Sequence, residues 1–232
     1  MKSFLRLGLT AIAAVLFFNV LAVTETKAQA NLQNEVLNRM DKHNKALQSL
    51  RSNVIMAKYN DQLKETDVTE GKTTYLPSKG RDAYVRIDWT KPLEEMLVVR
   101  NGEYALYRPR LKQVIIGKVK DAQGSGKANN ALAFMNMSKA QLKANYFVKY
   151  LGEETTSSGV KTNRLELTPK NAASYKLAEI WVDFNGMPIQ AKVIESNNDT
   201  VTVLLSNIEK NVTINVSLFD PKFPKDVKKI RG

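Results

Sequence analysis

The feature that most constrains the fold is a set of three apolar runs between residues 175 and 208, separated by Asn185-Gly186 and by Asn-Asn-Asp at residues 197–199. Apolar and polar residues alternate within the runs, as in IQAKV at residues 189–193. Asn-Gly adopts the positive φ angles of a tight hairpin turn at low steric cost. Alternation with a period of two places one face of a strand in water and the other in a core. The pattern therefore predicts an antiparallel meander whose buried face is either filled by its own side chains or left open for an apolar ligand.

The first half of the chain shows the same alternation. In the clearest run, Val85, Ile87 and Trp89 share one face of the expected strand. Asn101-Gly102 predicts a further two-residue hairpin. No helix is expected between these strands, which excludes a parallel α/β sheet. Including the second half, about eleven strands are expected, at residues 53–62, 67–76, 83–89, 96–100, 103–108, 111–119, 146–154, 161–168, 175–184, 188–196 and 200–208.

The middle of the chain interrupts the strands. A short, strongly apolar segment at residues 131–137 (ALAFMNM) is rich in helix-forming residues. Ser138 and Gln141 form the pattern of a capping box that begins a second short helix at residues 139–145. Two short helices between the halves of a meander favour a cover over its open face, and ordinary core filling is the alternative. After the last meander, the prolines of residues 220–232 suit an edge strand or an exit segment.

The N-terminal region carries the features of an export signal. Lys2 and Arg6 precede an apolar run at residues 7–23, and small residues at Ala28 and Ala30 favour cleavage between Ala30 and Asn31. An uncleaved membrane anchor is the alternative. We therefore expect a signal peptide at residues 1–30 and a single domain at residues 31–232. The chain has no cysteine, which excludes disulfide bonds and a lipidated cysteine after the signal.

Apolar residues spaced three or four apart predict an amphipathic helix at residues 31–50. His43, the one histidine of the chain, lies beside its apolar stripe and is interpreted as a boundary residue. With no cysteine and one histidine, neither a thiol nucleophile nor a Ser-His-Asp arrangement is expected. No cluster of His, Asp and Glu has metal-ligand spacing. The sequence thus predicts a protein that is not an enzyme and has no metal or cofactor.

The formal net charge is +12. Because the chain is expected to be exported, an acidic membrane surface or an acidic partner is favoured over nucleic acid. A solvated cationic surface is an equally good interpretation.

The order of these elements, with several short motifs, resembles the periplasmic outer-membrane lipoprotein carrier family (LolA) across the whole chain after residue 30. The matching blocks are Thr90-Lys91-Pro92, residues 97–102 (LVVRNG), Tyr107-Arg108-Pro109, Leu167-Thr168-Pro169-Lys170 and residues 223–227 (FPKDV). The last of these blocks has Lys225 where the family usually has glycine.

The resemblance implies an unclosed antiparallel β-barrel with a helical lid over an apolar cavity that holds acyl chains. It implies a periplasmic carrier, expected to be a monomer, that takes lipoproteins from an inner-membrane release complex to an outer-membrane receptor. Contact with membrane surfaces would be transient. The residues expected to line the cavity and the lid are Val85, Ile87, Trp89, Leu97, Val99, Leu132, Phe134, Met135, Met137, Ile180, Val182, Phe184, Val203 and Leu205.

The resemblance also places Arg81 at the arginine that ties strand to lid in the family. Asp82 stands where proline is usual and offers a local partner, and Lys79 is a second candidate for the same role. An exposed loop arginine is the alternative. Two other functions remain open: a carrier of a different lipid, such as a glycolipid or phospholipid, and a lipid-sensing envelope-stress regulator of the same fold.

Overall fold

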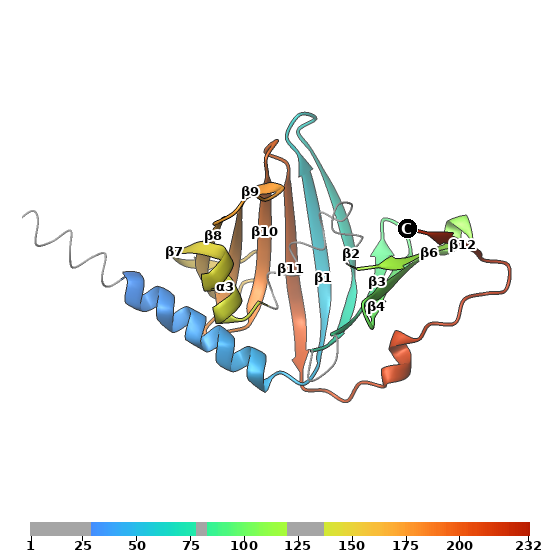
Figure 1. Cartoon of the computed structure of the whole chain (residues 1–232), viewed down its shortest axis with the longest axis horizontal. Helices are drawn as coiled ribbons and strands as arrows, with labels where there is room; N and C mark the ends of the chain where they lie inside the picture. The colour runs from blue at the N-terminus through green and yellow to red at the C-terminus, as the bar shows by residue number, and fades with distance from the viewer. Residues whose placement is uncertain (1–28, 78–82, 120–136) are drawn as a thin grey trace, which may run out of the picture.

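The structure, a computed structural model, describes residues 29–77, 83–119 and 137–232. The described strands form one twelve-stranded sheet in the order β12-β6-β5-β4-β3-β2-β1-β11-β10-β9-β8-β7 (Figure 1). The strands are β1 (Leu50–Asn60), β2 (Glu65–Leu76), β3 (Tyr84–Lys91), β4 (Glu95–Arg100), β5 (Glu103–Arg108), β6 (Gln113–Lys118), β7 (Tyr146–Thr155), β8 (Lys161–Pro169), β9 (Tyr175–Asp183), β10 (Pro188–Glu195), β11 (Thr200–Lys210) and β12 (Lys228–Arg231).

The sheet curls but does not close, because β7 and β12 form its two edges and do not pair with each other. Neighbouring strands are antiparallel except β12, which pairs with β6 in parallel. The predicted unclosed, mainly antiparallel β-barrel is confirmed, with twelve strands instead of about eleven. The additional strand is β12, in the proline-containing segment that was expected to form an edge strand or an exit.

Two helices of the described chain pack on one face of the sheet, called the inner face below. The N-terminal helix covers residues 29–46, and α3 (Lys139–Asn145) lies beside it (Figure 1). Leu37 and Met40 of the N-terminal helix and Leu142 of α3 are fully buried and join one core cluster. The Lys143 ammonium, on α3, donates to the Asn34 side chain over 2.6 Å, which links the two helices directly.

The N-terminal helix ends earlier than residue 50, which corrects the sequence-based boundary. Leu50 begins β1 and pairs with both Lys210 of β11 and Tyr75 of β2. Just before it, the Gln48 N–H donates to the Asn211 side chain over 2.7 Å. Backbone pairing on both sides and this side-chain contact replace the hydrogen bonds of a further helical turn.

The helix cap and turns agree with the sequence-based expectation at two places and differ from it at a third. Ser138 and Gln141 form the predicted capping box at α3. Asn101 and Gly102 both have positive φ, as a two-residue hairpin requires. Between β9 and β10, by contrast, only Gly186 has positive φ. The Asp183 carboxylate accepts hydrogen bonds from the N–H groups of Asn185 and Met187, which favours this wider turn.

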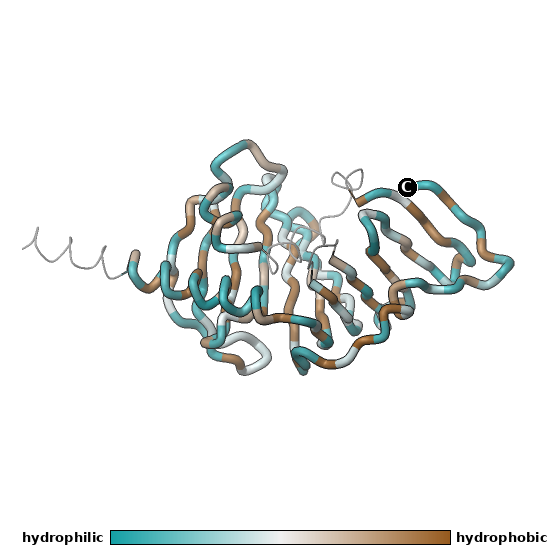
Figure 2. Tube along the Cα trace, turned by 60° about the horizontal axis from the view of Figure 1, so that its bottom comes forward, coloured by the Kyte–Doolittle hydropathy of each residue, from teal (hydrophilic) through white to brown (hydrophobic). Residues whose placement is uncertain are grey.

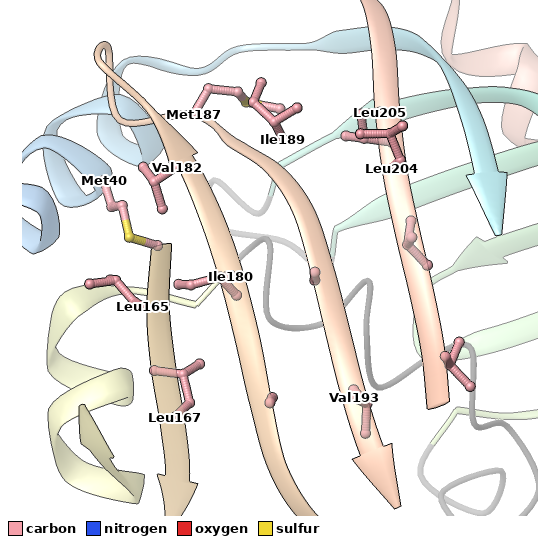
Figure 3. Packing of buried hydrophobic residues seen from close by; sticks show 14 of the residues in the cluster. Met40, Leu165, Leu167, Ile180, Val182, Met187, Ile189, Val193, Leu204 and Leu205 are labelled. Atoms are coloured by element: carbon pink, nitrogen blue, oxygen red, sulfur yellow. The ribbon is translucent and has the colours of Figure 1, made fainter. Parts of the chain in front are cut away.

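The main core lies between the inner face and the two helices, and Figure 3 shows Met40 among buried side chains of the neighbouring strands. Figure 2 shows hydrophobic and hydrophilic residues alternating along the trace of the strands. Alternation thus produces one continuous apolar face on the sheet, as the sequence predicted.

A second, smaller core lies on the opposite, outer face. The strap, residues 211–227, crosses this face and contains the 3-10 helix η3 (Val216–Phe219). Phe219 is buried against Tyr84, with ring centroids 5.6 Å apart, and Val98 completes the contact. The Arg86 guanidinium donates to the Leu218 carbonyl over 2.9 Å. The strap leads the chain from β11 to the far edge, where it forms β12.

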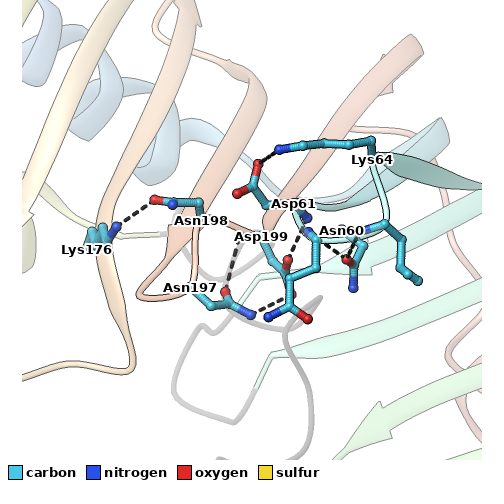
Figure 4. A network of polar contacts seen from close by, with 9 residues as sticks. Asn60, Asp61, Lys64, Lys176, Asn197, Asn198 and Asp199 are labelled. Carbon is cyan, nitrogen blue, oxygen red and sulfur yellow. Dashed lines mark hydrogen bonds and ion pairs between the residues drawn. The ribbon is translucent and has the colours of Figure 1, made fainter.

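Polar contacts join two neighbouring hairpins at the end of the sheet away from the N-terminal helix (Figure 4). The Asp61 N–H donates to the Asp199 carboxylate over 2.9 Å, and Lys64 pairs with Asp61 at 2.8 Å. Within the described ranges, no helix is both long and apolar enough to cross a membrane.

Candidate functional site

Strand pairing brings the predicted β3 and β4 residues together on the inner face. Val85 lies opposite Val99, and Ile87 lies opposite Leu97. Side chains opposite one another in an antiparallel pair point to the same face. Ile87 and Trp89 belong to the main core cluster, and Val85 and Leu97 pack against it.

The predicted residues of β9 and β11 lie on the same face, at the other side of the sheet. Ile180 and Val182 are fully buried, and Val203 and Leu205 are nearly so. The N-terminal helix and α3 fill this side through Met40 and Leu142. The remaining predicted lid residue within the described ranges, Met137, is half-buried against the same cluster.

The inner face therefore has two regions that differ in burial. The region on β8–β11 is closed by the chain's own side chains. The region on β3–β5 is less covered: Val85, Leu97 and Val99 are half-buried, although Ile87 is fully buried and Trp89 is 9 % exposed. An apolar ligand that enters without unfolding the main core would contact the second region first.

Four inner-face residues in this less covered region or on the strands next to it, β2 and β6, were not predicted from the sequence. Tyr75 lies opposite Val85, and Tyr104 lies opposite Val99. Leu106 lies opposite both Leu97 and Ile115. All four are half-buried. The Asn101-Gly102 hairpin sets the register of β4 and β5. Tyr104 and Leu106 could therefore have been assigned to the inner face from the position of this turn.

Several predicted residues are not placed on this face. Arg81, with the alternative Lys79, and the lid residues Leu132, Phe134 and Met135 lie outside the described residues. Phe184 lies in the turn after β9, is 48 % exposed, and has the Arg39 guanidinium 5.8 Å from its ring centroid. The expected cleavage residues Ala30 and Asn31 are exposed in the N-terminal helix.

Two phenols on or beside the inner face, those of Tyr75 and Tyr175, stay neutral near pH 7. Burial raises the pKa of Tyr75 to about 12. The Tyr175 pKa is also raised, first by burial and then by its hydrogen bond with Tyr146, whose hydroxyl is 2.7 Å away. These tyrosines therefore add no negative charge to the face, which suits an uncharged, apolar ligand.

A pocket of about 320 Å³ lies at one end of β3 and β4 and has a different chemistry. Trp89 contributes to its lining together with three carboxylates, and two of these are already paired. Asp88 pairs with Arg86 at 2.8 Å, and Glu95 pairs with Arg108 at 3.1 Å. Its lining combines these carboxylates with Trp89, Met96, Tyr107 and Pro109. No group of acidic or histidine side chains in the described ranges is arranged to hold a metal ion.

Comparison with known families gives a match over most of the chain. The model of the family described as outer membrane lipoprotein carrier protein LolA matches residues 62–222. The chain belongs to the LolA family. The matched range begins at the β1–β2 turn and ends in the strap. Both regions of the inner face, on β3–β5 and on β8–β11, therefore lie within the match to the family model.

Two solved structures share the fold of this chain. An uncharacterized conserved protein from Thermus thermophilus is similar with a TM-score of 0.55 and 14 % identity, over 86 % of this chain and 98 % of the other. MucB is similar with a TM-score of 0.56 and 11 % identity, over 85 % of this chain and 65 % of MucB. At these identities the likeness concerns the fold. A comparison with curated protein sequences gives no match.

Proposed function

We propose that this LolA-family protein is a periplasmic carrier that binds the acyl chains of lipoproteins on the inner face and delivers them from the inner to the outer membrane. The observation that carries the proposal is the apolar inner face, which continues from the filled region on β8–β11 to the half-buried region on β3–β5. The family match over residues 62–222 supports it. Residues 31–232 would be the mature protein, acting as a monomer.

In this proposal, the half-buried side chains Val85, Leu97 and Leu106 make the first contact with an acyl chain. Each methylene removed from water contributes about 0.8 kcal/mol, whatever head group follows it. The inner face therefore explains lipid capture, and the choice of lipoprotein would depend on the inner-membrane release complex and the outer-membrane receptor.

The test is to purify the protein from the periplasm and identify bound lipid or lipoprotein by mass spectrometry, in wild type and in two variants. Val85→Glu places a carboxylate on the half-buried inner face, where an unpaired charge opposes an acyl chain. Lys72→Glu is the control, because Lys72 is exposed on the outer face of β2, opposite Asp88. Arg86 is unsuitable as a control because it holds the strap.

We expect triacylated lipoproteins with the wild type and with Lys72→Glu, and much less with Val85→Glu. Recovery of phospholipid or glycolipid instead would identify a carrier of another lipid. Equal losses in both variants would show that the inner face is not the binding surface.

A regulatory function is a second candidate because the fold is similar to that of MucB, with a TM-score of 0.56. Recovery of a protein partner without bound acyl chains in the same experiment would favour it.

A further inference from the structure

The edge of the sheet formed by β6 and β12 has an unusual concentration of positive charge. We call the exposed basic residues of the β5–β6 turn, β6, β12 and the end of the strap the basic edge. Asp226 is the one acidic residue in residues 109–119 and 221–232, against eight basic residues. The eight are Arg110, Lys112, Lys118, Lys222, Lys225, Lys228, Lys229 and Arg231, all exposed.

The basic edge is built into the sheet. Lys228 lies beside Gln113 and Arg231 beside Ile116 in the parallel pairing of β12 with β6. The Lys228 N–H donates to the Lys112 carbonyl over 2.8 Å. Phe223 packs on Tyr107 with ring centroids 5.3 Å apart, which fixes the approach of the strap. The pairing of β12 with β6 thus brings these basic residues to the side of the sheet opposite β7 (Figure 1).

The charge on this edge is largely uncompensated. Lys112 pairs with Asp226 at 2.8 Å. In the described parts of the chain, none of the other seven basic residues forms an ion pair. Like charges this close raise the local potential and attract an extended anionic surface.

An exposed apolar side chain lies within the same edge. Leu111 is 62 % exposed at the end of the 3-10 helix η1 (Pro109–Leu111), between Arg110 and Lys112. A leucine between two long basic side chains suits the boundary of a bilayer. The leucine reaches the acyl region while the cationic groups stay with the phosphates.

We propose that the basic edge docks on an anionic phospholipid surface, with Leu111 inserted at shallow depth. Single-stranded nucleic acid is disfavoured because such proteins present aromatic platforms, and the aromatic side chain of the strap at this edge, Phe223, packs on Tyr107. An acidic protein is disfavoured because protein interfaces are usually anchored by aromatic residues in pockets, and the exposed anchor here is one leucine. The inference goes beyond acyl-chain carriage and does not depend on it.

The test measures sedimentation with phosphatidylcholine vesicles, with and without phosphatidylglycerol. The edge variant carries Lys225→Gln, Lys228→Gln, Lys229→Gln and Arg231→Gln. The control variant carries Lys58→Gln, Lys72→Gln, Lys149→Gln and Lys161→Gln, which removes the same charge from exposed lysines elsewhere on the sheet.

We expect the wild type and the control variant to bind anionic vesicles and to ignore neutral ones. The edge variant should bind at least about tenfold more weakly. Binding should disappear between about 0.1 M and about 1 M salt, as the Debye length falls from about 10 Å to about 3 Å. Leu111→Ala, which keeps every charge, should weaken binding about fivefold.

An equal loss of vesicle binding in the edge and control variants would overturn the proposal, because the net charge of the protein alone would then explain the binding. Equal binding to neutral and anionic vesicles would also overturn it, and an unchanged Leu111→Ala would remove the insertion step. Binding of a fluorescent fatty-acid probe should stay at the wild-type level in all variants. That measurement separates loss of docking from loss of the fold or of the proposed acyl site.

Discussion

Gly186 shows how one residue fixes the N-terminal helix to the sheet. Its φ is +86°, in the left-handed region that favours glycine, and a Cβ at this position would overlap the Arg39 carbonyl of the helix. Gly159 has a similar φ of +80° but has open space around a Cβ. The two glycines therefore separate the conformational cost of a substitution from its steric cost.

We predict that Gly186→Ala lowers the free energy of unfolding by at least about 2 kcal/mol, because it adds a collision with the helix to the strain of the left-handed conformation. Gly159→Ala should lower it by about 1 kcal/mol, from the conformational strain. Urea unfolding of both variants measures the difference. Equal losses would show that the helix adjusts freely over the β9–β10 turn.

The lowered pKa of His43 leads to a prediction of how the stability of the fold changes with pH. Burial, and then the nearby charge of Lys210, lower the pKa of His43 below 6.5, and Asp183 opposes the shift in part. A lowered pKa means that the unfolded chain binds a proton more readily than the folded one. The contribution of His43 is therefore fully present above about pH 6.5 and is lost as the pH falls towards the folded pKa.

We expect the melting temperature of the wild type to fall between about pH 7.5 and about pH 5.5. The fall should be smaller in His43→Gln, which removes the titrating group and keeps a polar side chain. Thermal unfolding at the two pH values tests this. An identical fall in both proteins would assign the pH dependence to other groups.

Residue burial could be predicted from alternation only where one face of a strand is wet. The inner face of Val85 and Ile87 could be read from the sequence, although Tyr84 on the outer face of the same strand is also buried, by the strap. On β9 the rule fails, because Glu179 and Trp181, on the outer face, are also buried. Arg164 covers them: its guanidinium lies 5.0 Å from the Trp181 ring centroid and 2.6 Å from the Glu179 carboxylate. This contact joins β8 to β9, so it depends on strand pairing, which the local sequence of β9 does not reveal.

Among the elements, the strap has the clearest structural role. It carries Phe219, 1 % exposed, into the small outer core against Tyr84 and Val98. Since β12 follows the strap directly, loss of this anchor would also loosen the pairing of β12 with β6.

We predict that Phe219→Ala lowers the free energy of unfolding by about 3 to 5 kcal/mol. It should also speed amide hydrogen exchange in η3 and β12 more than in β9 and β10. Phe147→Ala is the control, because Phe147 is 65 % exposed on β7 and its truncation should change stability little. Uniform acceleration of exchange across the sheet would mean that the strap is not a separate unit.

The sequence predicted elements with strong local patterns and not those that depend on distant partners. Ser138 and Gln141 give the start of α3, and Asn101-Gly102 gives the β4–β5 hairpin. The parallel pairing of β12 with β6 could not be predicted, because β12 has four residues and follows a proline-containing segment. Its partner is set by the contacts of Phe219 and Phe223, which lie far along the chain from the residues they touch.

At the scale of the whole molecule, the surfaces are divided among different tasks. The two helices cover the β8–β11 region of the inner face, the strap stabilises the outer face, and the edge opposite β7 carries the basic residues. Docking through that edge would leave the inner face free to receive a ligand. Affinity for the ligand then depends on how much of the inner face is already occupied by the protein itself.

A carrier must release what it binds, and the filled region limits the affinity. Complete burial of one long acyl chain would contribute more than about 10 kcal/mol, at about 0.8 kcal/mol per methylene. Leu165 and Ile180 already contact the core and are fully buried, so a ligand in that region must displace contacts of Met40 or Leu142. Every displaced contact reduces the net free energy gained by burying the acyl chain. The half-buried region on β3–β5 offers burial without this cost, but only for part of a chain.

We therefore predict a dissociation constant near the micromolar range for a single acyl chain, or about −8 kcal/mol. Displacement of a fluorescent apolar dye by a lipopeptide measures it. Val85→Glu should weaken binding at least about tenfold, since an uncompensated charge would face the chain, whereas the outer-face variant Lys72→Glu should bind as the wild type does. Picomolar, irreversible retention would contradict carriage, because cargo held that tightly could not pass to a receptor on any useful timescale.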